Sequence, residues 1–108
     1  MCDVESTFRA LQHRRRRNAL DCVRTHQSLA LADLAELVLE RETGTPASEH
    51  DPERVRSVYF SLYHTHVPVL RDASLVRYDQ HADVVAVRDE AVPSLESAHD
   101  ALESLLGA

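Results

Sequence analysis

The sequence predicts an α+β domain that is mostly α, in which three helices are followed by a β-hairpin and a C-terminal helix. Apolar residues recur at intervals of three and four along the chain up to residue 70, as they do on the buried face of a helix. Beyond that point, two short alternating stretches flank a polar turn, which is typical of a hairpin. A length of 108 residues fits one core, which we assign to residues 1–90, with residues 91–108 as the C-terminal helix.

The N-terminal part carries two apolar groups separated by a run of four arginines. Ser6 or Thr7 can cap a first helix that contains Phe8 and Leu11. The second group follows Arg14–Arg17 and consists of Ala19, Leu20 and Val23. This spacing predicts either two short helices or one bent helix.

The next helix has the clearest periodicity. Its apolar positions fall at i, i+3, i+4 and i+7, at Leu31, Leu34, Ala35 and Val38. Gly44 is a suitable residue for the end of this helix, because glycine adopts the left-handed conformation without strain. We therefore expect a helix that ends at Gly44, followed by a polar loop over residues 45–50.

A third helix is predicted to begin after Asp51 and to cover about residues 52–70. Asp51 can cap its free amides, and Pro52 in the first turn sacrifices no hydrogen bond. One predicted face packs against the core and contains Val55, Val58, Tyr59, Leu62, His66 and Leu70. The opposite face is polar and nearly uncharged and contains Arg54, Ser57, Ser61, His64 and Thr65. Pro68 lacks an amide hydrogen, which predicts a kink or an early stop near Val67.

The C-terminal third predicts a hairpin and a final helix. Val76 and Tyr78 alternate as in a strand, Val84–Val87 supply a second strand, and residues 79–83 form the turn. After Pro93, apolar residues repeat at the spacing of a coiled-coil seam, at Leu95, Ala98, Leu102 and Leu105. We expect this seam to form a homodimer near Phe8 and Leu11, with folding back onto its own domain as the alternative.

Composition limits the classes of function. All twelve basic residues are arginine, against eighteen Asp and Glu, so the formal net charge is −6. A GC-rich genome and selection for a hydrated acidic surface in a salt-rich cytoplasm both produce this balance, so we interpret it as a halophile signature. No apolar run is long enough to span a bilayer, and no signal peptide is visible, which predicts a cytoplasmic protein without membrane contact.

The reactive side chains favour neither an enzyme nor a cofactor. Cys2 and Cys22 have no metal-binding or redox spacing, although a redox sensor would be possible with a depressed thiol pKa. His64 with His66, or Cys22 with His26, lack a third metal ligand in any recognised motif. No nucleophile elbow, glycine-rich phosphate loop or His-Glu metal helix is present, so we expect no catalysis, no metal and no cofactor.

The predicted order of helices and hairpin matches the winged helix-turn-helix plan. The stretch from Ser61 to Val76 resembles the segment from recognition helix to wing in arsenic-repressor-type regulators, with Ser74 where that family usually has glycine. Over residues 8–88, the chain is also similar to a haloarchaeal winged-helix family of unknown function. That similarity rests on Arg14–Arg17, on Leu34-Ala35-Glu36, and on the run from Val58 to Leu70.

These resemblances imply a DNA-binding transcriptional regulator of archaeal type. The third helix would enter the major groove of double-stranded DNA, and hairpin 76–88 would lie along the backbone as the wing. The expected DNA contacts are Arg54, Ser57, Ser61, His64 and Thr65 in the helix, Arg77, Gln80, His81 and Arg88 in the wing, and Arg14, Arg15, Arg16 and Arg17 at the groove margin.

Two alternatives remain open at the level of sequence. Some of the four arginines would instead pair with carboxylates such as Asp33 and Glu36 and fix the packing of the helices. The whole domain could also be a winged-helix interaction module that has lost its affinity for DNA. The acidic net charge favours that second alternative, although molar salt weakens the electrostatic part of DNA binding in any case.

Overall fold

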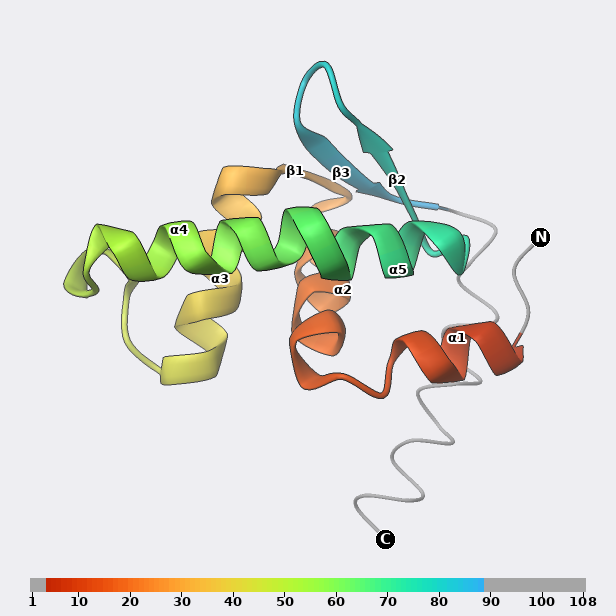
Figure 1. Ribbon diagram of the computed structural model, residues 1–108, viewed down its shortest axis with the longest axis horizontal. Helices are drawn as coiled ribbons and strands as arrows, with labels where there is room; N and C mark the ends of the chain where they lie inside the picture. The colour runs from red at the N-terminus through yellow and green to blue at the C-terminus, as the bar shows by residue number, and fades with distance from the viewer. Residues whose placement is uncertain (1–3, 89–108) are drawn as a thin grey trace, which may run out of the picture.

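The computed structural model describes residues 4–88, which are mostly helical and carry one small antiparallel sheet (Figure 1). This confirms the predicted α+β, mostly α class. The predicted C-terminal helix, with Leu95, Ala98, Leu102 and Leu105, lies outside the described residues. The elements are α1 (Val4–Ala10), α2 (Arg14–His26), β1 (Ser28–Ala30), α3 (Leu31–Thr43), a 3₁₀ turn (Ala47–Glu49), α4 (Pro52–Ser61), a π-helical turn (Leu62–His66), α5 (Val67–Asp72), β2 (Val76–Asp79) and β3 (Val84–Val87).

The N-terminal part forms two helices rather than one bent helix. His13 caps α2, and its Nδ1 accepts a hydrogen bond from the backbone amide of Arg15 at 3.2 Å. Two arginine side chains then satisfy carbonyls at the end of α1. Arg16 Nε donates to the carbonyl of Ala10 at 2.5 Å, and Arg17 donates to the carbonyl of Leu11 at 2.9 Å. The break is therefore stabilised, because carbonyls without a partner inside the helix find one in the next helix.

Helix α3 ends where the sequence predicts. Gly44 has a left-handed φ of 76° and donates its amide to the carbonyl of Glu40 at 2.8 Å. The strand β1, directly before α3, is not among the predicted elements. Its three residues pair with β3, with Leu29 opposite Val85. A strand of three residues carries too little periodicity to be recognised from sequence.

The third predicted helix continues past Pro68, so the predicted early stop does not occur. In Figure 1, α4 and α5 form one long rod. The π-helical turn Leu62–His66 lies directly before the proline, and the amide of Val67 donates to the carbonyl of Leu62. A proline in a regular α-helix loses one hydrogen bond and its ring meets the carbonyl four residues earlier. The wider π turn takes up this disturbance inside the helix.

The predicted hairpin is confirmed and forms two of the three strands. Strand β3 lies in the centre, and the order across the sheet is β1-β3-β2. Tyr78 in β2 faces Val85, and Arg77 faces Ala86. The hairpin projects from the helical layer beside the rod formed by α4 and α5 (Figure 1).

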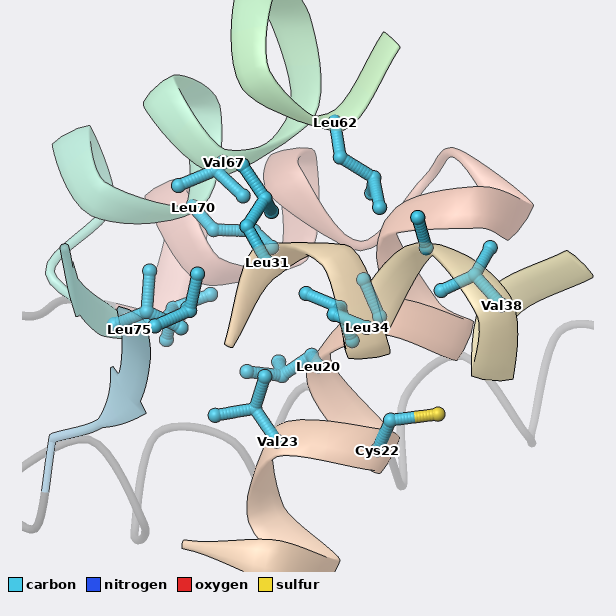
Figure 2. Packing of buried hydrophobic residues seen from close by; sticks show 14 of the residues in the cluster. Leu20, Cys22, Val23, Leu31, Leu34, Val38, Leu62, Val67, Leu70 and Leu75 are labelled. Carbon is cyan, nitrogen blue, oxygen red and sulfur yellow. The ribbon is translucent and has the colours of Figure 1, made fainter. Parts of the chain in front are cut away.

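The core lies between α2, α3, the α4–α5 rod and the sheet (Figure 2). Leu34, Ala35 and Val38 are fully buried, as their spacing predicts. On the predicted packing face of the third helix, Val58, Leu62, His66 and Leu70 are buried, whereas Val55 and Tyr59 are half-buried. In residues 4–88, no helix combines the length and the apolar character that crossing a bilayer requires.

Candidate functional site

One side of the α4–α5 rod remains open to solvent, and we call it the free face. It consists of Arg54, Ser57, Phe60, His64 and Thr65, all of which are exposed. Four of these five residues are among the predicted DNA contacts. Phe60 is the addition, and its side chain is 48% exposed. Its position in the sequence could have revealed it, because it lies three residues after Ser57 and four before His64, the spacing of one helix face. An apolar residue is, however, more readily assigned to the core.

Ser61, which the sequence places on the same face, is turned toward a neighbouring helix instead. It is half-buried, and its hydroxyl accepts a hydrogen bond from Arg15 Nη1 at 3.1 Å. Arg15 also donates two hydrogen bonds to the Glu42 carboxylate, from Nε to Oε2 at 2.6 Å and from Nη2 to Oε1 at 2.7 Å. The forked pair lowers the pKa of Glu42 and raises that of Arg15. Ser61 therefore belongs to a polar junction of α2, α3 and α4.

The four arginines at the start of α2 divide between packing and exposure. Arg15, Arg16 and Arg17 use their guanidinium groups within the fold, as described above. The carboxylate partner is Glu42 rather than Asp33 or Glu36. Arg14 is exposed and makes no ion pair with any residue in the described part of the chain.

Arg14 and Arg54 line the same cleft at the edge of the free face. Together with His13, Arg15, Glu42 and Thr43, they line an open cleft of about 360 Å³. The cleft lies where α2 and α4 begin and α3 ends. Because Glu42 is neutralised by Arg15, the exposed guanidinium groups of Arg14 and Arg54 give this edge a local positive charge on an otherwise acidic chain. Such a cleft suits a phosphate group.

The other edge of the free face is fixed to the hairpin by Asp83. Tyr59 in α4 donates its hydroxyl to Asp83 Oδ2 at 2.6 Å, and Tyr78 in β2 donates to Oδ1. The carboxylate raises the pKa of Tyr59 through its hydrogen bond, whereas burial and then Asp83 raise that of Tyr78. Asp83 has a positive φ of 56°, and its carbonyl accepts the amide of Leu31 at 2.8 Å. One residue thus joins the hairpin to α3 and α4.

Aromatic rings continue from this anchor to the free face. The ring centroids of Tyr78 and Tyr63 are 6.2 Å apart in an edge-to-face contact, and those of Tyr63 and His64 are 4.9 Å apart. His64 stacks on Phe60 at 5.8 Å with an interplanar angle of 17°, and Tyr59 meets Phe60 edge-on at 5.5 Å. We call these five residues the aromatic ridge.

The predicted wing residues lie at the exposed end and edge of the hairpin. Arg77, Gln80 and His81 are exposed, and Arg88 is half-buried. The turn is held by Asp79, whose Oδ1 accepts the amides of His81 at 3.0 Å and Ala82 at 3.2 Å. These polar side chains therefore project from a turn of defined shape.

His66 and Cys22 belong to the core. Burial, followed by the charges of His13 and Arg16, lowers the pKa of His66 to about 4, so its imidazole is neutral at pH 7. Burial raises the pKa of Cys22, which is the opposite of what a thiol redox sensor requires, whereas Cys2 lies outside the described residues. In residues 4–88, no cluster of three or more potential metal ligands is present.

The predicted dimer contacts on α1 differ in exposure. Leu11 is 4% exposed and belongs to the core, whereas Phe8 is half-buried against it. A partner subunit meeting this surface would therefore contact Phe8 more than Leu11.

Comparison with known protein families identifies a match. A family model described as a domain of unknown function (DUF7344) matches residues 8–86, which contain all the helices from α2 to α5 and nearly all of the sheet. No curated protein and no solved structure matches the chain. Because the family model covers more than half of the sequence, the chain belongs to the DUF7344 family of domains of unknown function.

Proposed function

We propose that this protein is a winged helix-turn-helix DNA-binding regulator of transcription, with α4–α5 in the major groove and the hairpin as the wing. The observation that carries the proposal is the free face itself: an exposed, mostly polar helix face between a cleft lined by Arg14 and Arg54 and a hairpin fixed by Asp83, with the one carboxylate beside it, Glu53, paired to Arg56. The element order α2-β1-α3-α4-β2-β3 and the sheet order β1-β3-β2 support it, since winged helices have this arrangement.

Within this proposal, the predicted contacts have different roles. Ser57, His64 and Thr65 offer short hydrogen-bonding side chains to base edges. Arg14 and Arg54 would hold one phosphate, and Arg77, Gln80 and His81 would meet the backbone on the wing side. Ser61, Arg15, Arg16 and Arg17 act indirectly by positioning the helices, because their polar atoms are engaged inside the fold.

A homodimer is part of the proposal. Two recognition helices that read one site must be held about one DNA turn apart, which a two-fold axis achieves. The apolar seam of residues 95–105 is the segment proposed to form that axis, together with Phe8.

The acidic net charge of −6 sets the conditions under which binding should be sought. Counterion release normally supplies much of the affinity of a protein for DNA, and concentrated salt removes most of that contribution. Binding in a salt-rich cytoplasm would depend on hydrogen bonds, apolar contact and shape. Concentrated KCl, which also screens the repulsion between this acidic surface and phosphate, is therefore the proper medium.

The alternative is an interaction module that docks on another protein. The exposed ring of Phe60 favours this alternative, because docking surfaces are apolar. However, the other four residues of the free face are polar, and a docking patch normally needs several apolar neighbours. The free face therefore fits a nucleic acid better than an apolar partner.

The proposal is tested by placing a negative charge on the free face. The full-length protein is used to select duplexes from a randomised DNA pool in concentrated KCl, and affinity is measured by fluorescence anisotropy. Thr65→Glu should weaken binding by about tenfold or more, because its carboxylate would meet phosphates and base acceptors. Thr25→Glu, an exposed threonine on α2 outside the free face, serves as the matched control and should bind as the wild type does. Equal affinity of Thr65→Glu and the wild type would remove α4–α5 from the interface.

A further inference from the structure

Phe60 is unusual for the part of the chain that the structure describes. Among residues 4–88, the large apolar side chains that are clearly exposed are those of Val4, near the N-terminus, and Phe60. Phe60 lies in the middle of α4–α5, on the line between Ser57 and His64. Moving an apolar ring out of water is favourable, so a partner that covered the exposed part of Phe60 would gain binding free energy.

The ring is also held in place. It stacks on His64 and meets Tyr59 edge-on, and both neighbours belong to the aromatic ridge. Tyr59 is fixed by its hydrogen bond to Asp83, and Tyr63 lies between Tyr78 and His64. Phe60 is therefore positioned relative to the hairpin before any partner arrives, which reduces the entropy lost on binding.

We propose that Phe60 reads the C5-methyl group of a thymine in the major groove. This inference rests on the proposed DNA-binding function and names a base that the free face would select. The thymine methyl is the main apolar group that the bases of unmodified DNA present in the major groove, and phenylalanine is one of the side chains that contact it. Phe60 lies between Ser57 and His64, whose polar groups can hydrogen-bond to neighbouring base edges.

The surroundings of Phe60 favour a methyl group over an apolar protein surface. The adjacent residues on the free face, Ser57 and His64, are polar, and Arg56 beside them pairs with Glu53 at 3.8 Å. Phe60 is the one apolar side chain of the free face, which matches one methyl group among hydrogen-bonding base edges. A protein partner would need a broader apolar patch.

The test removes the methyl group and leaves every hydrogen bond of the base pair intact. Each thymine of the selected duplex is replaced in turn by deoxyuridine, and affinity is measured in concentrated KCl. At one thymine per half-site, the wild type should lose about three- to fivefold in affinity, as expected for one methyl group removed from apolar contact. Phe60→Ala should bind all duplexes more weakly and should not distinguish thymine from deoxyuridine at that position.

Two controls make this coupling specific. Thr65→Ala should bind more weakly yet keep the full sensitivity to deoxyuridine, because it leaves the ring of Phe60 in place. If cytosine and 5-methylcytosine are placed at the same position, the wild type should prefer the methylated base by a similar factor. A weaker affinity for 5-methylcytosine than for thymine then identifies thymine as the base that the site prefers.

The outcomes separate the inference from the proposed function. If the wild type binds its selected duplex but no deoxyuridine substitution weakens binding, Phe60 does not read a methyl group, while DNA binding stands. The same conclusion follows if Phe60→Ala retains the wild-type sensitivity. If the pool yields no bound duplex with the folded wild type, both proposals fail, and Phe60 becomes a candidate contact for a protein partner.

Discussion

Individual polar side chains, some of them buried, connect the helices of this protein. Arg15 joins α2 to both α3 and α4 through Glu42 and Ser61. His66 is 5% exposed, with its Nδ1 3.4 Å from Arg16 Nη1 and its ring centroid 4.5 Å from that of His13. Burial disfavours a protonated His66, and the nearby Arg16 guanidinium disfavours it further, which is why the fold holds it neutral.

We predict that His66 makes the fold sensitive to mild acid. Its pKa is about 4 in the folded protein and 6.5 in an ordinary setting, so between these values the unfolded chain binds more protons. The contribution of His66 is therefore fully present above about pH 6.5 and is lost as the pH falls toward 4. His66→Gln should have a free energy of unfolding that depends less on pH in this range.

The measurement is urea unfolding of the wild type and His66→Gln at several pH values. Other groups near His66, namely His13, Arg15, Arg16 and Glu42, are present in both proteins, so their contributions largely cancel. The stability difference between wild type and variant should shrink as the pH falls. A constant difference would show that His66 does not titrate in this way.

At the level of elements, the two edges of α4–α5 are fixed by different interactions. Toward α2 and α3, the contact is the junction of Arg15, Glu42 and Ser61. Toward the hairpin, it is the carboxylate of Asp83 with the hydroxyls of Tyr59 and Tyr78. Between them the rod continues past Pro68, because Val67 and Leu70 are buried in the core and hold α5 against it.

We predict that Asp83 couples the hairpin to α4. Asp83→Ala removes the acceptor of two hydroxyls and places alanine at a positive φ, so it should destabilise the protein by about 2–3 kcal/mol. Tyr59→Phe should cost about 1–2 kcal/mol in the wild type and much less in the Asp83→Ala background. Urea unfolding of the four proteins in this cycle measures the coupling.

Tyr63→Phe serves as a control for general damage to the aromatic ridge. Within residues 4–88, the hydroxyls that bind the Asp83 carboxylate are those of Tyr59 and Tyr78, and not that of Tyr63. Its effect should be the same with and without Asp83. Additive losses for Tyr59→Phe and Asp83→Ala would mean that the hydroxyl and the carboxylate do not interact in solution.

At the scale of the whole molecule, the question is how many copies act together. The described residues make a domain whose core includes Leu11, with Phe8 half-buried on the outside of it. The acidic charge disfavours association at low salt and is screened at high salt. Assembly should therefore be examined in the same concentrated KCl as DNA binding.

We predict a homodimer that depends on the C-terminal seam. Truncating Leu102 and Leu105 to alanine should give a folded monomer and, under the proposed function, weak DNA binding, because the seam would hold the α4–α5 rods of two subunits at one spacing. Light scattering measures the mass, and thermal unfolding measures the stability. Leu106→Ala, adjacent to the seam but off its repeat, is the matched control and should remain dimeric.

Two results would contradict this prediction. A monomeric wild type at micromolar concentration in concentrated KCl would exclude the dimer. A strongly destabilised Leu102→Ala, Leu105→Ala variant of unchanged mass would mean that the segment covers its own domain, since deleting buried methyl groups there would open a cavity in the core.

The sequence by itself determined the helices with strong local signals. The spacing of Leu34, Ala35 and Val38 together with Gly44 defined α3. The alternation of Val76 and Tyr78 before a polar turn, and the apolar run Val84–Val87 after it, defined the hairpin. Both kinds of signal are local, because a periodic apolar face or a turn residue acts on its own neighbourhood. Four residues of the free face were likewise predictable from their angular positions on one helix.

Only the tertiary structure decided which polar residues of that helix stay open to solvent. Ser61 and Thr65 look alike in sequence, yet Arg15 on another helix engages Ser61 and leaves Thr65 exposed. Phe60 is apolar like a core residue, but the residues on the opposite face of the rod already fill the core. The continuation past Pro68 depends in the same way on burial of Val67 and Leu70. The physical reason is that these outcomes depend on contacts between distant segments, which no local pattern records.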